Sequence, residues 1–498
     1  MRRATLLVCS FLFAIESLAA VEPKALVVCD MEERPYSLDP FNNLDGKLSF
    51  VLRQVLGPRI DRDEHHALVP GIFAAWRNTA PTKWEFTIRK DLRFSDGSPL
   101  SVGDVVFSIE TAISKGSALA NEFGSIATVE GIGADKIEVT TKSPDPMLPA
   151  RFANRPFLVD KALYESLGHA YFAKPIGVWA YKIVSIDDAS LVLSRNARFP
   201  DKTSGMESIV YRFIKGGQAR IEALKKGEID ILTELSPTMS LDVARDPDLS
   251  VVKVTVAQYV ALFFDVLPDP DGLFSDKSMR EFMYRAIDDS ELIALAVNGN
   301  GLPLATITMP QEFGYNPSLK PRPADLVAAQ NLLQKRRSLE SSPLTIRIAV
   351  VDYLENIGKT IKGQLAKYGV DAELMVLPRD EVISKVMLKK EIKADAFIVD
   401  PMDPFLDASF QLNLETNSAY ATAWFSTQEI KTLLGKANLE MDETARADLL
   451  SRVQTALYDD FGPLPLYQKI ALYGVSKKVK NFHPLADIYL RLENVGKE

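Results

Sequence analysis

Three aspartates lie close together late in the chain, at Asp400, Asp403 and Asp407. They follow Ala394–Val399, an apolar run that predicts a buried strand. Carboxylates gathered after a strand can bind a cation or an amine, because each offers oxygen acceptors and a negative charge. A solvated loop is the other interpretation, and the residue types alone do not separate the two.

Known catalytic patterns are absent from the sequence. It contains neither the nucleophile elbow G-x-S-x-G, nor the zinc motif H-E-x-x-H, nor the phosphate loop G-x-x-x-x-G-K-[ST]. The adjacent pair His65-His66 is poorly suited to one metal ion, because neighbouring side chains diverge on a regular element. The glycine-rich run 298–301 follows a predicted helix, so we expect it to end that helix and not to bind phosphate. We expect no enzyme, metal site or cofactor, although a catalytic triad built from distant residues would leave no such pattern.

The elements that would position the aspartates change character along the chain. Strands dominate the first half, with predictions at 84–89, 137–141, 191–194, 209–214 and 229–232. The second half alternates strands with helices, at Leu344–Val351, Ile357–Tyr368, Val370–Leu377, Asp380–Leu388 and Ala394–Val399. This order predicts a parallel sheet with helices on its faces. Ligands bind at the carboxyl ends of such strands, which draws attention to the loop after Val399.

Helices are also predicted outside this unit. One covers Asp104–Ser114, with Asp104 as its N-cap and Gly116 as a stop signal. Others are expected over Met279–Val297, Ala324–Arg337, Glu429–Asn438 and Glu443–Asp459.

Length and composition narrow the class of protein. A chain of 498 residues with 47% hydrophobic and 25% charged residues is typical of a folded protein of about three domains. The net charge of −8 argues against a nucleic-acid partner. Only Cys9 and Cys29 are present, which excludes a disulfide scaffold. Cys29 lies in an apolar run that predicts a buried strand, so we interpret it as an inert core thiol.

The N-terminus has the features of an export signal. Basic residues at Arg2 and Arg3 precede an apolar run from Ala4 to Ile15, and small residues stand at Ser17 and Ala19. This pattern predicts a cleaved signal peptide over residues 1–19. The apolar run is too short to span a bilayer. We therefore expect a periplasmic protein.

Several segments in order resemble the bacterial extracellular solute-binding proteins of family 5, the peptide and nickel class of ABC importers. The most specific are W-E-F-T-I-R-K at 84–90, F-S-D-G-S-P-L at 94–100 and D-V-V-F-S at 104–108. Further matches are S-L-D-P at 37–40, the segment 69–76, K-G-E-I-D at 226–230, M-R-E-F-M-Y-R-A-I-D-D at 279–289 and D-P-M-D-P-F-L at 400–406.

The resemblance implies a fold and a function. The expected fold is α/β, a two-lobed periplasmic binding protein of type II, cluster C, with an extra domain inserted in lobe I. We assign lobe I to 20–50, 176–262 and 468–498, the inserted domain to 51–175 and lobe II to 263–467, with the hinge near Leu262 and Gln468. A monomer would capture a peptide or peptide-like small solute between closing lobes and deliver it to an inner-membrane ABC permease. A sensory binder of an opine, sugar or metal chelate is the alternative, and a periplasmic enzyme is less favoured.

The resemblance also points to candidate ligand-binding residues. In lobe I these are the residues after S-L-D-P, namely Asn42, Asn43, Leu44, Asp45 and Gly46, for which a simple turn is the other interpretation. Trp179 stands near the hinge where family members usually have glycine, and either packs or touches the ligand.

In lobe II, peptide binders carry an aspartate that pairs with the α-amino group of the peptide. That loop is shorter here, which argues against the usual amine anchor. Asp400 and Asp403 are the candidates to replace it.

Overall fold

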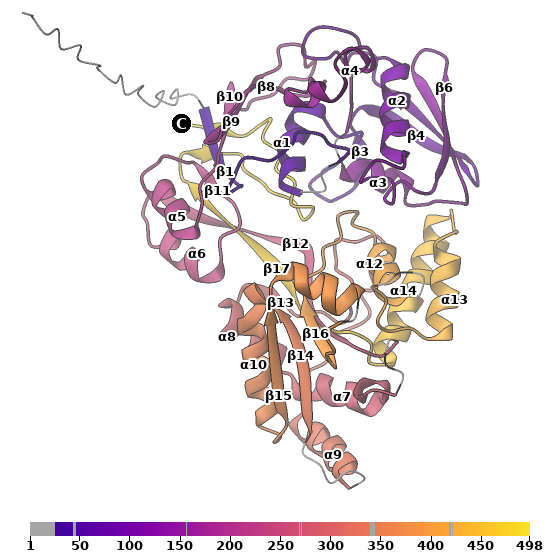
Figure 1. Ribbon diagram of the computed structural model, residues 1–498, viewed down its shortest axis with the longest axis vertical. Coiled ribbons are helices and arrows are strands. Elements are labelled where there is room, and N and C mark those ends of the chain that lie inside the picture. The colour runs from indigo at the N-terminus through magenta and orange to yellow at the C-terminus, as the bar shows by residue number, and fades with distance from the viewer. Residues whose placement is uncertain are drawn as a thin grey trace, which may run out of the picture.

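Two bodies, one above the other in Figure 1, make up the molecule. The computed structural model describes residues 25–42, 46–155, 157–267, 269, 271–338, 344–389, 391–417, 420 and 422–498. The expected signal peptide and residues 43–45 lie outside this part. The upper body contains both chain ends of the described part, and the lower body contains roughly residues 260–466. Within the described residues, no helix combines the length and the apolar character needed to cross a membrane.

One mixed sheet runs through both bodies. Its order is β15 (Asp371–Leu377), β14 (Thr345–Val351), β16 (Ala396–Val399), β12 (Leu249–Phe264), β17 (Leu464–Ser476), β11 (Ile231–Leu232), β1 (Ala25–Cys29), β10 (Ser208–Arg212), β9 (Ser190–Arg195) and β8 (Tyr181–Ile186). The short strand β13 (Gly301–Leu302) also pairs with β17.

The strands β12 and β17 connect the two bodies (Figure 1). They have 16 and 13 residues, so at about 3.3 Å per residue they extend over about 50 Å and about 40 Å. Their antiparallel pairing is interrupted between Thr255 and Tyr259. On the upper side of this break β17 pairs with β11, and on the lower side β12 pairs with β16.

The upper body has a second, separate sheet of antiparallel strands. Its order is β4 (Phe73–Ala80), β5 (Lys83–Ile88), β7 (Lys136–Thr141) and β6 (Ile126–Ile132). Around it and the upper half of the large sheet lie α1 (Gly46–Leu56), α2 (Val102–Ile113), α3 (Leu148–Asn154), α4 (Lys161–Leu167), α5 (Gly217–Lys225) and α6 (Pro237–Ala244). Short elements complete this body: β2 (Ile60–Arg62), β3 (Leu68–Pro70), the 3-10 turn η1 (Gly168–Ala173), β18 (Val479–Lys480) and β19 (Gly496–Lys497).

The strand predictions for the first half are confirmed, but the predicted start of α2 is wrong. Ser101, not Asp104, is its N-cap. The Ser101 hydroxyl accepts the N–H of Asp104, and the Asp104 carboxylate accepts the N–H of Ser101 at 2.9 Å. Because this reciprocal capping box satisfies two backbone N–H groups at the N-terminus, the helix begins at Val102. It ends at Ile113, where Ser114 is extended, before Gly116 is reached.

The predicted β-α-β-α-β unit forms the sheet of the lower body. Both β15 and β16 run parallel to the central strand β14. The connecting helices are α10 (Glu355–Ala366), after the 3-10 turn η3 (Asp352–Leu354), and α11 (Arg379–Glu381), which continues into the π-helical turn η4 (Val382–Leu388). The remaining elements are η2 (Leu273–Ser275), α7 (Lys277–Ala286), α8 (Asp289–Val297), α9 (Leu326–Arg337), α12 (Ala408–Thr416), α13 (Gln428–Ala437) and α14 (Glu443–Asp459).

The structure has two helices in the lower body where the sequence predicted one. The prediction of a single helix over Met279–Val297 is wrong, because Ile287 and Asp288 are extended between α7 and α8. Asp288 caps α8 by accepting the N–H groups of Ser290 and Glu291. Asn298, in the left-handed conformation, ends α8, so the glycine-rich run does terminate a helix as expected.

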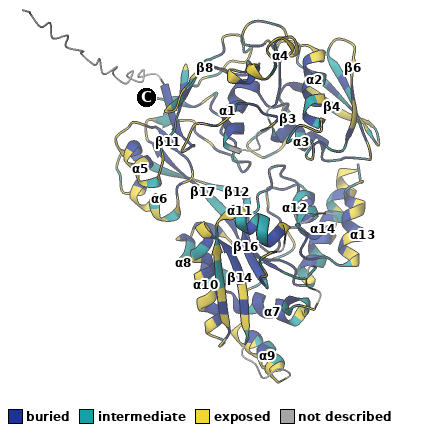
Figure 2. Ribbon diagram, in the orientation of Figure 1, coloured by how far each residue is buried: buried dark blue, intermediate teal, exposed yellow. Residues whose placement is uncertain are grey.

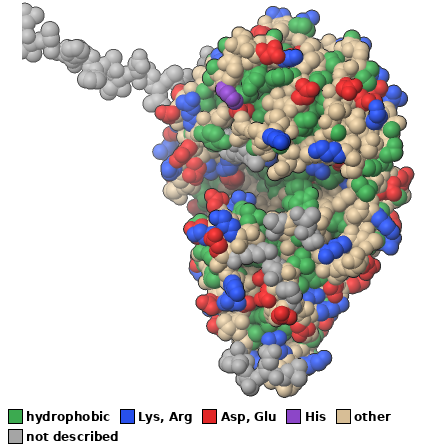
Figure 3. Space-filling view, turned by 45° about the vertical axis from the view of Figure 1, so that its right-hand side comes forward, with side chains coloured by type: hydrophobic (Ala, Val, Ile, Leu, Met, Phe, Trp, Pro, Cys, Tyr) green, Lys and Arg blue, Asp and Glu red, His purple; other side chains and the backbone are tan. Residues whose placement is uncertain are grey.

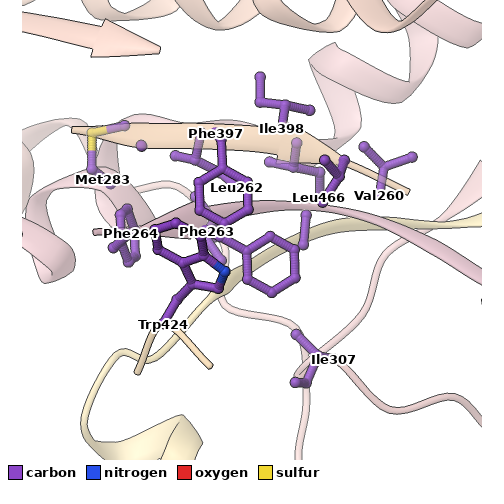
Figure 4. Close-up of a cluster of buried hydrophobic side chains, with 14 of the residues drawn as sticks. Val260, Leu262, Phe263, Phe264, Met283, Ile307, Phe397, Ile398, Trp424 and Leu466 are labelled. Atoms are coloured by element: carbon purple, nitrogen blue, oxygen red, sulfur yellow. The ribbon is translucent and has the colours of Figure 1, made fainter. Parts of the chain in front are cut away.

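Apolar side chains are buried in the interior of both bodies (Figure 2). In the lower body, Phe263 stacks on Phe397 at 5.3 Å, and Phe397 meets Trp424 edge-on at 4.3 Å between ring centroids (Figure 4). Such aromatic pairs contribute about 0.5–1.5 kcal/mol beyond their buried area. In the upper body, Cys29 is fully buried in β1 and burial raises the pKa of its thiol, as expected for an inert core residue.

Candidate functional site

The carboxyl ends of the three parallel strands meet at one edge of the lower body. Tyr353 follows β14, Arg379 follows β15 after one proline, and Asp400 follows β16 directly. This edge of the lower body faces the upper body, and α11 marks it in Figure 2. The space-filling view shows the surface hollowed between the two bodies (Figure 3). The loop singled out from the sequence therefore lies at the place where α/β sheets bind ligands.

Asp400 is held by three side-chain donors. The Tyr353 hydroxyl donates to Oδ1 at 2.7 Å. The Gln258 amide and the Lys469 ammonium both donate to Oδ2, at 3.0 and 2.8 Å. The Asp400 side chain is only 7% exposed, whereas that of Lys469 is 31% exposed. Burial, followed by the charge of Asp400, raises the pKa of the Tyr353 hydroxyl.

Two of these donors come from the strands that join the bodies. Gln258 lies in the interrupted part of β12, and Lys469 lies on β17 between Gln468 and Ile470, the residues that pair on either side of the interruption. The segment after β16 lies along the same interruption, where Gln258 bridges to Met402 and the N–H of Asp403 donates to Ala257. The cluster formed by Gln258, Tyr353, Asp400 and Lys469, here called the Asp400 cluster, therefore links the lower sheet to the crossing strands.

Asp403 is completely buried and bonded to its own loop. Its two oxygens accept the backbone N–H groups of Phe405 and Asp407, at 2.8 and 2.7 Å. Burial, with the charge of Asp407, raises the pKa of Asp403 to about 7. The neighbouring carboxyl of Glu312 also has a raised pKa, mainly because it is buried. In this conformation Asp403 presents no surface to a solute.

Asp407 is also internal. Burial alone would raise the pKa of its carboxyl, but the charge and hydrogen bonds of Arg446 hold it below its usual value. The three aspartates thus have three different sets of partners and do not converge. Within the described residues, no cluster of three or more histidine, cysteine or acidic side chains is arranged to hold a metal ion.

Trp179 is a packed residue of the upper body. Its side chain is 7% exposed, and its ring lies 4.9 Å from that of Phe199 between centroids. The indole ring also lies against Gly57, where an added Cβ would be 2.5 Å from the ring. The packing interpretation accounts for this geometry, and a contact between Trp179 and the ligand stays a prediction.

The predicted lobe I stretch is only partly described. Asn42 is exposed, and its amide donates to Asp39 at 2.7 Å, as in a turn. Gly46 begins α1. Asn43, Leu44 and Asp45 lie outside the described residues. A ligand role for these five residues stays a prediction.

Asp30 is a notable residue that the sequence analysis missed. It follows β1 at the carboxyl end of the parallel strands β1, β10 and β11, the counterpart in the upper body of the position of Asp400. The side chain is 1% exposed, and the Thr233 hydroxyl donates to Oδ1. Oδ2 has no hydrogen-bond partner in the described part. Burial raises the pKa of Asp30 to about 6. The strand-end rule that drew attention to Asp400 would also have found Asp30.

Comparison with known proteins gives relatives over nearly the whole chain. A probable D,D-dipeptide-binding periplasmic protein of Escherichia coli K12 is 22% identical, covering 96% of this chain and 95% of the relative. The dipeptide-binding protein DppE of Bacillus subtilis is 22% identical, with coverage of 92% and 90%. The nickel-binding periplasmic protein of E. coli K12 is 22% identical, with coverage of 88% of each chain.

Solved structures share the fold. NikA from Brucella suis in complex with Fe(III)-EDTA matches with a TM-score of 0.84 and 18% identity, over 95% of this chain and 99% of that one. HbpA2 from Haemophilus parasuis matches with a TM-score of 0.83 and 17% identity, over 95% and 100%. These likenesses confirm the expected two-lobed α/β fold. The family model for bacterial extracellular solute-binding proteins, family 5, matches residues 67–426. The chain therefore belongs to the bacterial extracellular solute-binding proteins of family 5.

Proposed function

We propose that this solute-binding protein works in the periplasm, where it captures a small solute between its two bodies and delivers it to an inner-membrane ABC permease. Family membership supports solute capture. The names of the relatives support a periplasmic location and a peptide or peptide-like solute. The single observation that carries the proposal is the Asp400 cluster, a polar site at the strand ends beside the two crossing strands.

The division into lobes is part of the proposal. Lobe I comprises 20–50, 176–262 and 468–498, the inserted domain 51–175 and lobe II 263–467. The separate sheet β4-β5-β7-β6 supports an inserted domain. The interruption between Thr255 and Tyr259 supports a hinge, because the regular pairing of β12 with β17 is broken there and a break in the ladder lets the strands bend. The protein acts as a monomer and has no enzymatic activity in this proposal.

The proposal is tested by native mass spectrometry of protein purified from the periplasm, before and after mild unfolding. We expect an additional mass that is released on unfolding, and its fragments then give the solute class. Uptake of the same solute, labelled, is expected to be lost in a strain without the permease. An empty protein whose melting temperature is unchanged by a peptide panel and by metal chelates would contradict solute capture.

A further inference from the structure

The charge of Asp400 is already compensated within the chain. Its carboxylate receives three donors, and one of them is the full positive charge of Lys469 at 2.8 Å. An ammonium group on a solute would have to displace Lys469, leave that ammonium without its partner and enter a site that is almost closed. Exchanging one ammonium for another brings no net electrostatic gain. Asp400 is therefore a counter-ion of Lys469.

Neither of the other aspartates offers a replacement. Each oxygen of Asp403 accepts a backbone N–H group of its own loop, and its side chain is completely buried. Asp407 is paired with Arg446. Both carboxylates are completely or almost completely buried. The loop after β16 thus has no carboxylate available for a cationic solute in this conformation.

The accessible charged groups at the Asp400 cluster and beside it are cations. Lys469 Nζ carries three N–H groups, one of which bonds Asp400, and its side chain is 31% exposed. Tyr353 is more than half exposed, but its hydroxyl donates its one proton to the other oxygen of Asp400 and has none left for a solute. The exposed Arg379 interacts with Tyr353. The carboxylate of the exposed Asp352, at the same strand end, accepts the backbone N–H of Tyr353 at 2.8 Å.

Resting on the proposed function, we propose that Lys469 is the charged group that meets the solute, and that the solute presents a carboxylate to it. Asp400 then serves as a positioning residue: it holds the ammonium in place through a short ion pair, and Gln258 and Tyr353 fix the carboxylate of Asp400 in turn. A charge-assisted N–H···O bond from a fixed ammonium is stronger than a neutral one and orients the solute carboxylate. The solute class is thus anionic or zwitterionic at this end of the cleft.

Three blocked tripeptides test this proposal by isothermal titration calorimetry. N-acetyl-trialanine has only a carboxylate, trialanine amide has only an ammonium, and N-acetyl-trialanine amide has neither. We expect N-acetyl-trialanine to bind at least tenfold more tightly than the other two. Equal binding of all three, preference for the amine, or no binding of the carboxylate probe would overturn the inference. Release of a solute in the mass spectrometry experiment would still support solute capture in each of those cases.

Variants of the ion pair separate the two roles. Lys469→Met is expected to weaken binding of N-acetyl-trialanine at least tenfold, and Lys469→Arg to retain it. Because Lys469→Met leaves Asp400 buried without its counter-ion, the double variant Asp400→Asn/Lys469→Met provides a charge-balanced second test and should lose binding equally. Asp400→Asn alone keeps the ammonium of Lys469 but removes the carboxylate that positions it, so it should weaken binding of N-acetyl-trialanine less than Lys469→Met does. An amine anchor at Asp400 would instead appear as binding of trialanine amide that is lost in Asp400→Asn.

Lys253→Met is the matched control. Lys253 lies on the other crossing strand, β12, and its ammonium donates to Asn300 at 2.8 Å and not to Asp400. Its substitution should leave the affinity for N-acetyl-trialanine within twofold. Unchanged affinity in Lys469→Met and in the double variant would overturn the assignment of Lys469.

Discussion

Arg446 binds Asp407 through two N–H···O bonds, of 2.7 and 2.8 Å, inside the lower body. Arg446 also donates to the Ser409 hydroxyl at 2.7 Å. Because both charged side chains are almost fully buried, each depends on the other for compensation. The pair fixes the start of α12 to α14, and it explains why an aspartate that looked available for binding from the sequence is structural.

Removing Arg446 should be strongly destabilising. Breaking a buried ion pair from one side costs about 3–5 kcal/mol, so Arg446→Met is expected to lower the free energy of unfolding by that amount. Urea unfolding measures it. Arg452→Met is the control, because Arg452 is an exposed residue of the same helix and lies 3.9 Å from Asp448. The control should change stability by less than about 1 kcal/mol. Equal losses in the two variants would contradict this account.

Trp179 and Gly57 should be coupled in stability. Gly57→Ala places a Cβ against the indole ring and keeps a positive φ of 79°, so we expect a clear loss of stability. Trp179→Ala should cost about 3–5 kcal/mol through the cavity that it leaves. In the double variant the clash is absent, so its loss should be smaller than the sum of the two single losses. Thermal unfolding of all four proteins gives the coupling, and additivity would exclude the predicted contact.

The same variants decide whether Trp179 touches the ligand. If the Trp179 ring only packs inside the upper body, Trp179→Ala should leave the solute affinity within about twofold of the wild-type value, measured at a temperature where the variant is folded. A tenfold loss would favour a direct ligand contact.

Phe405 forms a contact between the two bodies, and its loss should favour their separation. The ring packs on Met147 and Ala150 of the upper body and meets Phe410 at 4.7 Å, and the Phe405 carbonyl accepts a hydrogen bond from Arg62. Truncating a buried phenylalanine lowers the free energy of unfolding by about 3–5 kcal/mol. Part of the lost packing is the contact between the two bodies. Phe405→Ala should therefore increase the radius of gyration in small-angle X-ray scattering and weaken solute affinity.

The control for Phe405 is Phe107→Ala. Phe107 packs on Tyr164 at 5.6 Å within the upper body alone. Its substitution should leave the radius of gyration unchanged. An unchanged radius and affinity in Phe405→Ala as well would show that this contact does not restrain the two bodies.

Asp30 should make the protein less stable as the pH rises. Its pKa is raised from 3.8 to about 6 by burial, so the folded state favours the protonated carboxyl. This contribution is fully present below about pH 4 and is lost as the pH rises through about 6. The loss amounts to about 3 kcal/mol, at 1.36 kcal/mol per pH unit. Asp30→Asn should therefore remove a fall in the free energy of unfolding between pH 4 and pH 6.

Glu33→Gln is the control with the opposite sign. Lys215 lowers the pKa of the exposed Glu33 through a hydrogen bond and its charge. The stabilisation from Glu33 is therefore present at neutral pH and lost as the pH falls. If Asp30→Asn and the wild type lose stability in parallel between pH 4 and pH 6, the carboxyl of Asp30 does not titrate as described.

Local patterns predicted the elements well. The alternation of 84–89 and the apolar runs at 344–351, 370–377 and 394–399 correspond to β5, β14, β15 and β16. Helix boundaries were predicted less accurately, because they depend on a few capping hydrogen bonds that the apolar pattern does not show. Ser101 and Asp104 exchange two such bonds at the start of α2. Asp288 caps α8 and so divides what the sequence predicted as one helix.

The sequence by itself determined the family, the α/β class and the strand end at which to look for a site, because these depend on motifs and on the period of apolar residues along the chain. Only the tertiary structure decided which charges are free. Asp400, Asp403 and Asp407 look alike in sequence. Asp400 pairs with Lys469 and Asp407 with Arg446, which are 69 and 39 residues distant, whereas Asp403 accepts backbone N–H groups of its own loop and is buried. Whether a carboxylate can receive a solute depends on these pairings and on burial, which arise when distant segments pack together.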